Sequence, residues 1–318
     1  MATRVPILLL AAVLGASLLA SACRRECGGR AEEADGGLPP WVSAEELLPR
    51  IAEGRAVVFD SRARDAYRRG HIAGAWALPL DEVAPSGGEL DRATRERLAA
   101  VLASTGFDPG AELVVTDGDG WEGLRRAAAG CWLLALAGAQ RCSLLTGGAE
   151  AWRAAGGAVV LDQPVPPTDP RQVRIPARPP ALASLEFVRG ATARPEGAIV
   201  DVRDGADDPA RGGEEGGSIP GALIWPLPPP LPRGTTRAAG APFDVAAIEL
   251  SAAAAGLFAE REIVVVGHGF EDGALGWFLL RHGLGVRDAR LFPGGIAAWR
   301  DDPALPFSQR ELPLRAAR

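Results

Sequence analysis

The chain has 318 residues, of which 47% are hydrophobic and 23% are charged, and its formal net charge is -6. This length accommodates two ordinary domains of roughly 100–200 residues each, and the composition excludes a chain that is disordered throughout. The excess of negative charge excludes the basic surface of a nucleic-acid-binding protein. With only four cysteines, the chain is not a cysteine-rich disulfide scaffold.

The N-terminus has the pattern of an export signal, with Arg4 followed by the apolar run Val5–Leu19 and the small residues Ala20–Ala22. We therefore expect a signal peptide over residues 1–22. The run LLASAC resembles a bacterial lipobox, in which Cys23 is lipidated. This favours a lipid-anchored protein on the periplasmic face of a bacterial membrane. Cleavage by an ordinary signal peptidase, which would leave a soluble periplasmic protein, is the alternative.

Changes in composition divide the remainder of the chain. Residues 23–40 are charged, rich in glycine and without apolar periodicity, which predicts a flexible tether. A proline-rich passage at 161–180 predicts a linker between two domains, at 41–160 and 181–307. Residues 308–318 form a C-terminal tail.

Four segments of the first half recur in the same order in the second half, which indicates an internal repeat. The matched pairs are AVVFDSR and AIVDVRD, GHIAGAWALPL and GSIPGALIWPL, ELVVTDGDG and EIVVVGHGF, and SLLTGGAEAW and RLFPGGIAAW. In each copy a short apolar strand, such as Leu113–Thr116 or Ile263–Val266, is followed by a glycine-containing loop and a helix, expected at 124–136 and 274–280. This alternation predicts α/β domains with largely parallel sheets.

The ordered set of D-x-R, GHIAGA or GSIPGA, a buried strand with its loop, and a double glycine before A-W resembles the rhodanese domain, twice. The resemblance is to the family of thiosulfate and 3-mercaptopyruvate sulfurtransferases. It implies two rhodanese-like domains, each a mostly parallel sheet flanked by helices. It also implies a sulfur-carrying cysteine directly after the central strand, but Asp117 and Gly267 occupy these positions. Aspartate is common in the first domain of tandem members, whereas the second domain normally carries the chemistry.

A loop between a strand and a helix N-terminus gathers backbone N–H groups, which suits an anion and lowers the pKa of a thiol. Glycine supplies no nucleophile, and no nearby serine, threonine or lysine replaces the cysteine. We therefore predict a pseudoenzyme without catalytic residues. The candidate anion-binding residues of the two loops are Gly118, Asp119, Gly120, His268, Gly269, Phe270, Glu271, Asp272 and Gly273. Because the acidic side chains among them would repel an anion, we expect these to cap the helix N-termini or to lie on a solvated face.

Three other residues have structural interpretations. Cys131 and Cys142 are expected to be buried core cysteines, and a disulfide between them is the alternative, provided that their Cα atoms lie within ~7 Å. His71 is expected to fix the GHIAGA turn through a hydrogen bond. The residues predict no metal site and no cofactor.

These observations favour an exported, non-catalytic binding module. We expect its partner to be a small anion, a sulfur compound or another protein, and its contact with the membrane to be the N-terminal lipid; no nucleic acid is expected. Two alternatives remain at this stage. One is an active sulfurtransferase that uses thiosulfate or 3-mercaptopyruvate by an unusual route, and the other is a structural envelope lipoprotein.

Overall fold

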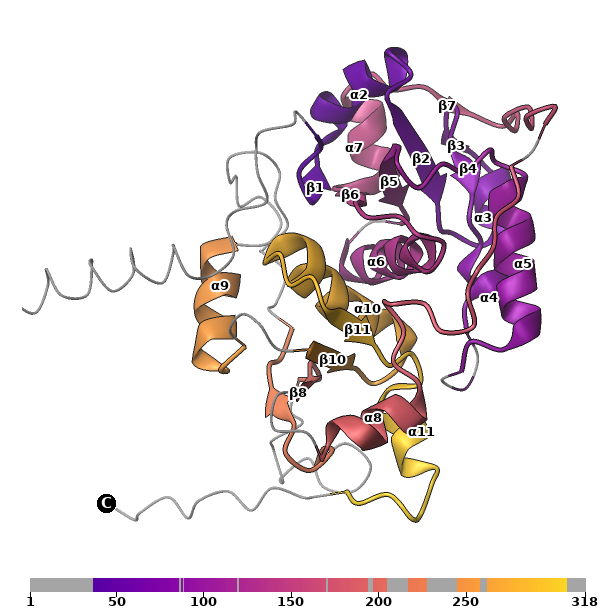
Figure 1. Ribbon diagram of the computed structural model, residues 1–318. Helices are drawn as coiled ribbons and strands as arrows, with labels where there is room; N and C mark the ends of the chain where they lie inside the picture. The colour runs from indigo at the N-terminus through magenta and orange to yellow at the C-terminus, as the bar shows by residue number, and fades with distance from the viewer. Residues whose placement is uncertain are drawn as a thin grey trace, which may run out of the picture.

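The computed structural model describes residues 37–85, 87, 89–118, 120–169, 171–193, 197–204, 217–227, 245–257 and 262–307. The expected signal peptide, Cys23, residues 23–36 of the tether, Asp119 and the tail 308–318 lie outside the described residues. Within the described ranges, no helix is both long enough and apolar enough to cross a membrane. Figure 1 shows two halves, each built around a sheet, with helices packed between them.

The first half contains a five-stranded sheet in the order β1-β6-β5-β2-β4, in which all neighbouring strands are parallel. Its strands are β1 (Trp41–Val42), β2 (Ala56–Asp60), β4 (Trp76–Ala77), β5 (Glu112–Thr116) and β6 (Ser143–Leu145), and a separate antiparallel pair is formed by β3 (His71–Ile72) and β7 (Val159–Val160). The helices are α2 (Ala44–Ala52), α3 (Arg64–Arg68), α4 (Leu80–Val83), α5 (Arg92–Ala103), α6 (Gly120–Leu136) and α7 (Gly148–Ala154).

The second half contains a four-stranded parallel sheet in the order β11-β10-β8-β9. Its strands are β8 (Gly197–Asp201), β9 (Leu223–Ile224), β10 (Glu262–Val266) and β11 (Ala289–Leu291), and its helices are α8 (Leu185–Ala191), α9 (Val245–Ala254), α10 (Phe270–Phe278) and α11 (Gly295–Arg300), with the π-helical turn η5 (Leu279–Gly283) after α10. A parallel bridge between Leu182 and Leu291 takes the place of the β1–β6 pairing. The two sheets therefore share one strand order, and the predicted α/β fold is confirmed.

Local sequence explains how these elements begin. Ser43 caps α2 and forms a capping box with Glu46, and Ser184 caps α8. The central strands β5 and β10 are buried over four of their five residues, as expected of strands covered on both faces. Helices α6 and α10 each begin four residues before the predicted start, because the loops that precede them have only three residues, 117–119 and 267–269.

Helices α6 and α10 pack against each other between the two sheets (Figure 1). Trp132 of α6 donates a hydrogen bond from its indole Nε1 to Ala181 O in the second half, at 2.9 Å, and meets the Phe270 ring edge-on at 5.3 Å between ring centroids. The largest cluster of buried apolar side chains contains residues of both halves. The two sheets thus share one core, and each half adds a smaller cluster of its own.

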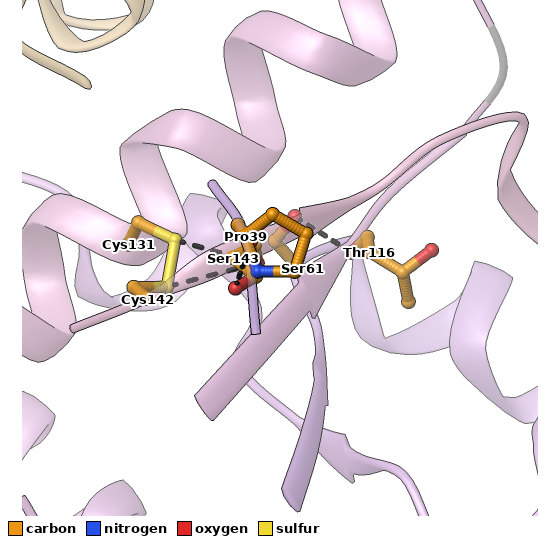
Figure 2. The surroundings of a disulfide bond; sticks show 6 residues. All are labelled: Pro39, Ser61, Thr116, Cys131, Cys142 and Ser143. Carbon is orange, nitrogen blue, oxygen red and sulfur yellow. Dashed lines mark hydrogen bonds between the residues drawn. A yellow bond between two sulfur atoms is a disulfide. The ribbon is translucent and has the colours of Figure 1, made fainter. Parts of the chain in front are cut away.

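Cys131 of α6 and Cys142, just before β6, are buried and form a disulfide (Figure 2). Their Cα atoms lie 5.7 Å apart, within the range that a disulfide requires. The cysteines are buried in the core, as the sequence predicted, and the disulfide that was the alternative interpretation is present. The disulfide joins the helix at the contact between the halves to the first sheet.

Candidate functional site

The D-x-R motifs at the ends of β2 and β8 form the same structure twice. Arg62 donates from Nε and Nη2 to the Asp60 carboxylate, at 2.9 and 2.6 Å, and from Nη2 to Gly70 O at 2.8 Å. Arg203 makes the equivalent bonds to Asp201, at 2.9 and 2.7 Å, and to Gly217 O, at 2.6 Å. The side chain of Arg203 is 1% exposed, and that of Arg62 is 21% exposed. In each half, the arginine therefore joins the aspartate at the end of the strand to the glycine at the start of the following turn.

The residue after the glycine of that turn differs between the halves. Ser218 donates a hydrogen bond from Oγ to Asp201 Oδ2 at 2.6 Å. At the matching position His71 is fully buried, and its Nδ1 lies 3.1 Å from Tyr67 O while its ring stacks on that of Tyr67. Burial raises the pKa of Tyr67 to about 12. His71 therefore holds the turn, as the sequence predicted.

In the first loop, the Asp117 carboxylate lies directly after β5 and is almost completely buried. Its Oδ1 accepts a hydrogen bond from Gly118 N at 2.6 Å, and its Oδ2 lies 2.7 Å from Ser61 Oγ and 3.3 Å from Arg126 Nε. Burial raises the pKa of Asp117, and the hydrogen bonds from Gly118 and Ser61 and the charge of Arg126 oppose that rise. The carboxylate itself therefore fills the position expected for a sulfur-carrying side chain.

In the second loop, Gly267 lies against the start of α10 so closely that no side chain fits. A Cβ atom placed on Gly267 would lie 2.5 Å from the backbone nitrogen of Gly273 and 2.9 Å from Asp272 Cβ. The loop is held from the other side, because Ile296 N donates to Gly267 O at 2.9 Å. Gly295, with φ of +58°, approaches the same carbonyl, so that a Cβ atom there would lie 2.7 Å from Gly267 O.

The acidic residues of the second loop contact arginines from the first half. Arg125 Nη1 pairs with Asp272 Oδ1, and Arg126 Nη1 pairs with Glu271 Oε1 at 3.0 Å. Burial raises the pKa of Glu271, and Arg126 and Arg125 oppose the rise. Both carboxylates lie in the first turn of α10, where a negative charge is favourable, but the N-cap residue is Gly269 and has no side-chain hydrogen bond. The acids instead form ion pairs across the contact between the halves.

The remaining loop candidates differ in exposure. Gly118, Gly120 and His268 are exposed. Gly269 and Phe270 are half-buried, with the Phe270 ring against Trp132, and Gly273 is buried against Leu291. Asp119 lies outside the described residues. Among the residues that the structure describes, no three histidine, cysteine, aspartate or glutamate side chains form a group that could hold a metal ion.

Sequence reasoning missed three residues of this site. Ser61 lies within D-S-R, whose counterpart is D-V-R, and the arginines at 125 and 126 form a basic pair on α6 that is absent from α10. Each is a position at which the two copies of the repeat differ in polarity. A comparison of the copies for such differences, in addition to their matches, would have found them.

Comparisons with known proteins agree with this fold. Residues 43–155 match the model of the rhodanese-like domain. A thiosulfate sulfurtransferase of Azotobacter vinelandii is 29% identical over 195 residues, covering 58% of this chain and 68% of that protein. A thiosulfate sulfurtransferase of Pseudomonas aeruginosa is 27% identical over 199 residues, with the same coverage.

Among solved structures, an anaerobic ergothioneine biosynthesis enzyme from Chlorobium limicola has a TM-score of 0.69 and 20% identity, over 85% of this chain and 70% of that one. The wild-type structure of EanB has a TM-score of 0.68 and 21% identity, over 85% of this chain and 69% of that one. At these identities the likeness concerns the fold alone.

Proposed function

We propose that this chain, a member of the rhodanese-like sulfurtransferase family, is an exported protein that does not transfer sulfur and that binds a protein partner. The observation that carries the proposal is the closed second loop. A Cβ atom at Gly267 would lie 2.5 Å from Gly273 N, so the position expected for the sulfur-carrying cysteine has neither a thiol nor the space for one.

Sulfur transfer by double displacement requires a nucleophile that holds the sulfur between donor and acceptor. The first loop offers Asp117, whose carboxylate forms no persulfide and is already hydrogen-bonded. The cysteines of the described residues are bonded to each other, and they are 0% and 4% exposed. No described side chain of the two loops therefore replaces the missing thiol.

The charges of the loops favour a protein partner over a small anion. Arg125 and Arg126, whose guanidinium groups contact the second loop, are already paired with Asp272 and Glu271. A small anion would have to displace one of these carboxylates or that of Asp117. Among the described residues, the most exposed large apolar side chains are those of Leu161, Val165 and Leu250. They are available for contact with a partner protein.

Two features support export. The sequence before residue 24 has the order of an export signal with a lipobox, which favours lipidation of Cys23. The disulfide between Cys131 and Cys142 is typical of proteins that fold in an oxidising compartment such as the periplasm. We therefore place the protein on the periplasmic face of a bacterial membrane, attached through its N-terminal lipid.

The first experiment measures sulfur transfer to cyanide by the purified full chain, with thiosulfate and with 3-mercaptopyruvate as donors. We expect no turnover above the protein-free background. The Cys131→Ala, Cys142→Ala double variant is the matched control, since it removes both cysteines of the described residues. Turnover by the wild-type chain that disappears in this variant would refute the proposal.

A second experiment separates the two classes of ligand. Thiosulfate, sulfite and phosphate are added during thermal unfolding of the full chain, and we expect the unfolding temperature to remain unchanged because the loop arginines are occupied. A saturable rise that Arg126→Gln abolishes would favour the small-anion function instead.

Export is tested by fractionation and lipid labelling of cells that carry the chain or its Cys23→Ser variant. Only the chain with Cys23 should be labelled.

A further inference from the structure

The first part of the proline-rich passage between the two halves, residues 161–169, lies on the outside of the protein. In this segment, LDQPVPPTD, every residue except the half-buried Pro164 is exposed. Val165 is 89% exposed and Leu161 is 69% exposed, and they are two of the three most exposed large apolar side chains among the described residues. Figure 1 shows the segment beyond β7, at the outer edge of the first half. Its apolar side chains therefore face water and do not cover the core.

Three prolines keep this segment extended. Pro164, Pro166 and Pro167 each hold φ at about −65°, and a residue that precedes proline is restricted to the β and polyproline II regions. The described stretch from Gln163 to Pro167 accordingly forms no helix, strand or turn. Residues 162–169 take no part in the hydrogen bonds of the described chain. An extended segment with a solvated backbone is typical of polyproline II.

Both ends of the segment are attached to the first half. Directly before it, β7 pairs with β3. At the other end, Pro167 lies on the turn after α5, where a Cβ atom on Gly106 would be 3.3 Å from Pro167 Cγ, and Arg171 pairs with Asp108 at 3.1 Å. Because its ends are held and its prolines limit its conformations, the segment loses little conformational entropy when it binds another molecule.

The second part of the same passage, residues 171–180, contacts the protein differently. Ile175 and Pro179 are buried, and Ile175 belongs to the core that the two halves share. These residues attach the passage to the fold. None of residues 161–169 is buried in this way, so Val165 and the prolines of the first part remain available for an external contact.

We propose that residues 161–169 are the docking segment for the protein partner, and that the partner binds them in a groove lined by aromatic side chains. The inference rests on the proposed function, because it names the chemistry of the partner proposed there. Polyproline II has three residues per turn, so Pro164 and Pro167 share the edge that lies toward the protein. Val165 and Pro166 lie on the other two edges and face outward. Aromatic-lined grooves recognise proline-rich segments of this shape.

The charges of the segment complement one kind of groove. Asp162 and Asp169 lie near its two ends, and it contains no basic residue. Neither carboxylate forms an ion pair within the part of the chain that the structure describes. A groove that complements this segment therefore carries basic side chains beside its aromatic surface. The same carboxylates oppose binding to an anionic lipid surface.

The first test locates the contact by photo-cross-linking in the full chain. The photo-reactive residue p-benzoylphenylalanine replaces Val165 in one variant and Leu250, an exposed apolar residue of α9, in the matched control. Both variants are irradiated in cells that naturally produce the chain, and the cross-linked peptides are identified by mass spectrometry. We expect position 165 to reach a protein, at peptides that line an aromatic groove, and position 250 to reach none.

The other outcomes separate this inference from the proposed function. A partner that is cross-linked from position 250 alone would overturn the docking segment but leave the protein-binding function intact. No cross-linked protein from either position would overturn both. Cross-links from position 165 to lipid, to a second copy of this chain or to a surface without aromatic residues would overturn the docking segment. If both positions reach the partner, the affinity measurements decide.

The second test measures the affinity of the purified cross-linked partner for the full chain, with a synthetic peptide of residues 161–169 as competitor. We expect the peptide to compete. Val165→Ser should weaken binding about tenfold, because a buried apolar contact is lost. Pro166→Ala should weaken it about threefold, because the free segment gains conformational freedom. Pro176→Ala, at an exposed proline of the second part, is the matched control and should leave the affinity unchanged. A peptide that does not compete, or equal losses in the two proline variants, overturns the proposal.

Discussion

The two loops that follow the central strands differ in how they are filled. In the first, the Asp117 carboxylate is inserted among Ser61, Gly118 N and Arg126; in the second, the backbone of Gly267 is pressed onto Gly273 and no side chain is present. The D-x-R motifs beneath the loops are the same in both halves. The comparison shows that one fold can keep its supporting hydrogen bonds while it closes the same position in two different ways.

The largest expected effect comes from the supporting motif. Arg203→Ala leaves the Asp201 carboxylate buried and without its guanidinium partner, which should lower the free energy of unfolding by about 3–5 kcal/mol. The matched variant Arg62→Ala, at a position where the arginine is partly exposed, should cost about 1–2 kcal/mol. Chemical denaturation of both variants measures the difference. Equal losses would show that burial does not distinguish the two motifs.

The next effect concerns the disulfide, which only the first half contains, since both cysteines after residue 27 lie there. The Cys131→Ala, Cys142→Ala double variant removes a cross-link that closes a short loop. Its free energy of unfolding should be lower by about 3 kcal/mol. Denaturation of the wild-type chain with and without reductant is the control. An unchanged stability would mean that the bond does not restrain the unfolded chain.

A smaller effect tests the closed loop directly. Gly267→Ala brings Cβ to 2.5 Å from Gly273 N, and the required shift of the backbone should cost about 1–3 kcal/mol. In the first loop, Gly118→Ala meets no atom within 4 Å and should change the free energy of unfolding by less than about 0.5 kcal/mol. Chemical denaturation of the two variants compares them. If alanine is tolerated equally at both positions, the second loop is not closed.

The last expected effect is absent at neutral pH and appears only on acidification, in the second half. Burial lowers the pKa of His282 to about 3, and its ring lies against Trp277 and Phe278. Because this pKa is below that of the unfolded chain, the stability contributed by neutral His282 is complete above about pH 6.5 and is lost as the pH falls toward 3. His282→Phe should flatten this part of the profile, measured by denaturation at several pH values. A profile that His282→Phe leaves unchanged would assign the loss to other groups.

Much of the fold could be predicted because the signals are local. The repeat, the apolar strands and the glycine-containing loops place β5, β10 and the helices after them without reference to distant residues. The ion-pair partners of Glu271 and Asp272 could not be predicted in this way, since these partners are arginines of α6 that lie about 145 residues earlier in the chain. The sequence alone does not decide between free cysteines and a disulfide for a related reason, because the bond depends on the distance between a helix and a strand.

The close packing of Gly267 limits which single substitutions this loop accepts. Cysteine at this position would bring its Cβ against Gly273 N and Asp272 Cβ, so the loop would have to shift to hold it. The neighbouring acids Glu271 and Asp272, which pair with Arg126 and Arg125, would also remain beside the new side chain. A thiol in a cationic loop would therefore require several substitutions made together, because the change at Gly267 alone supplies neither the space nor the charge.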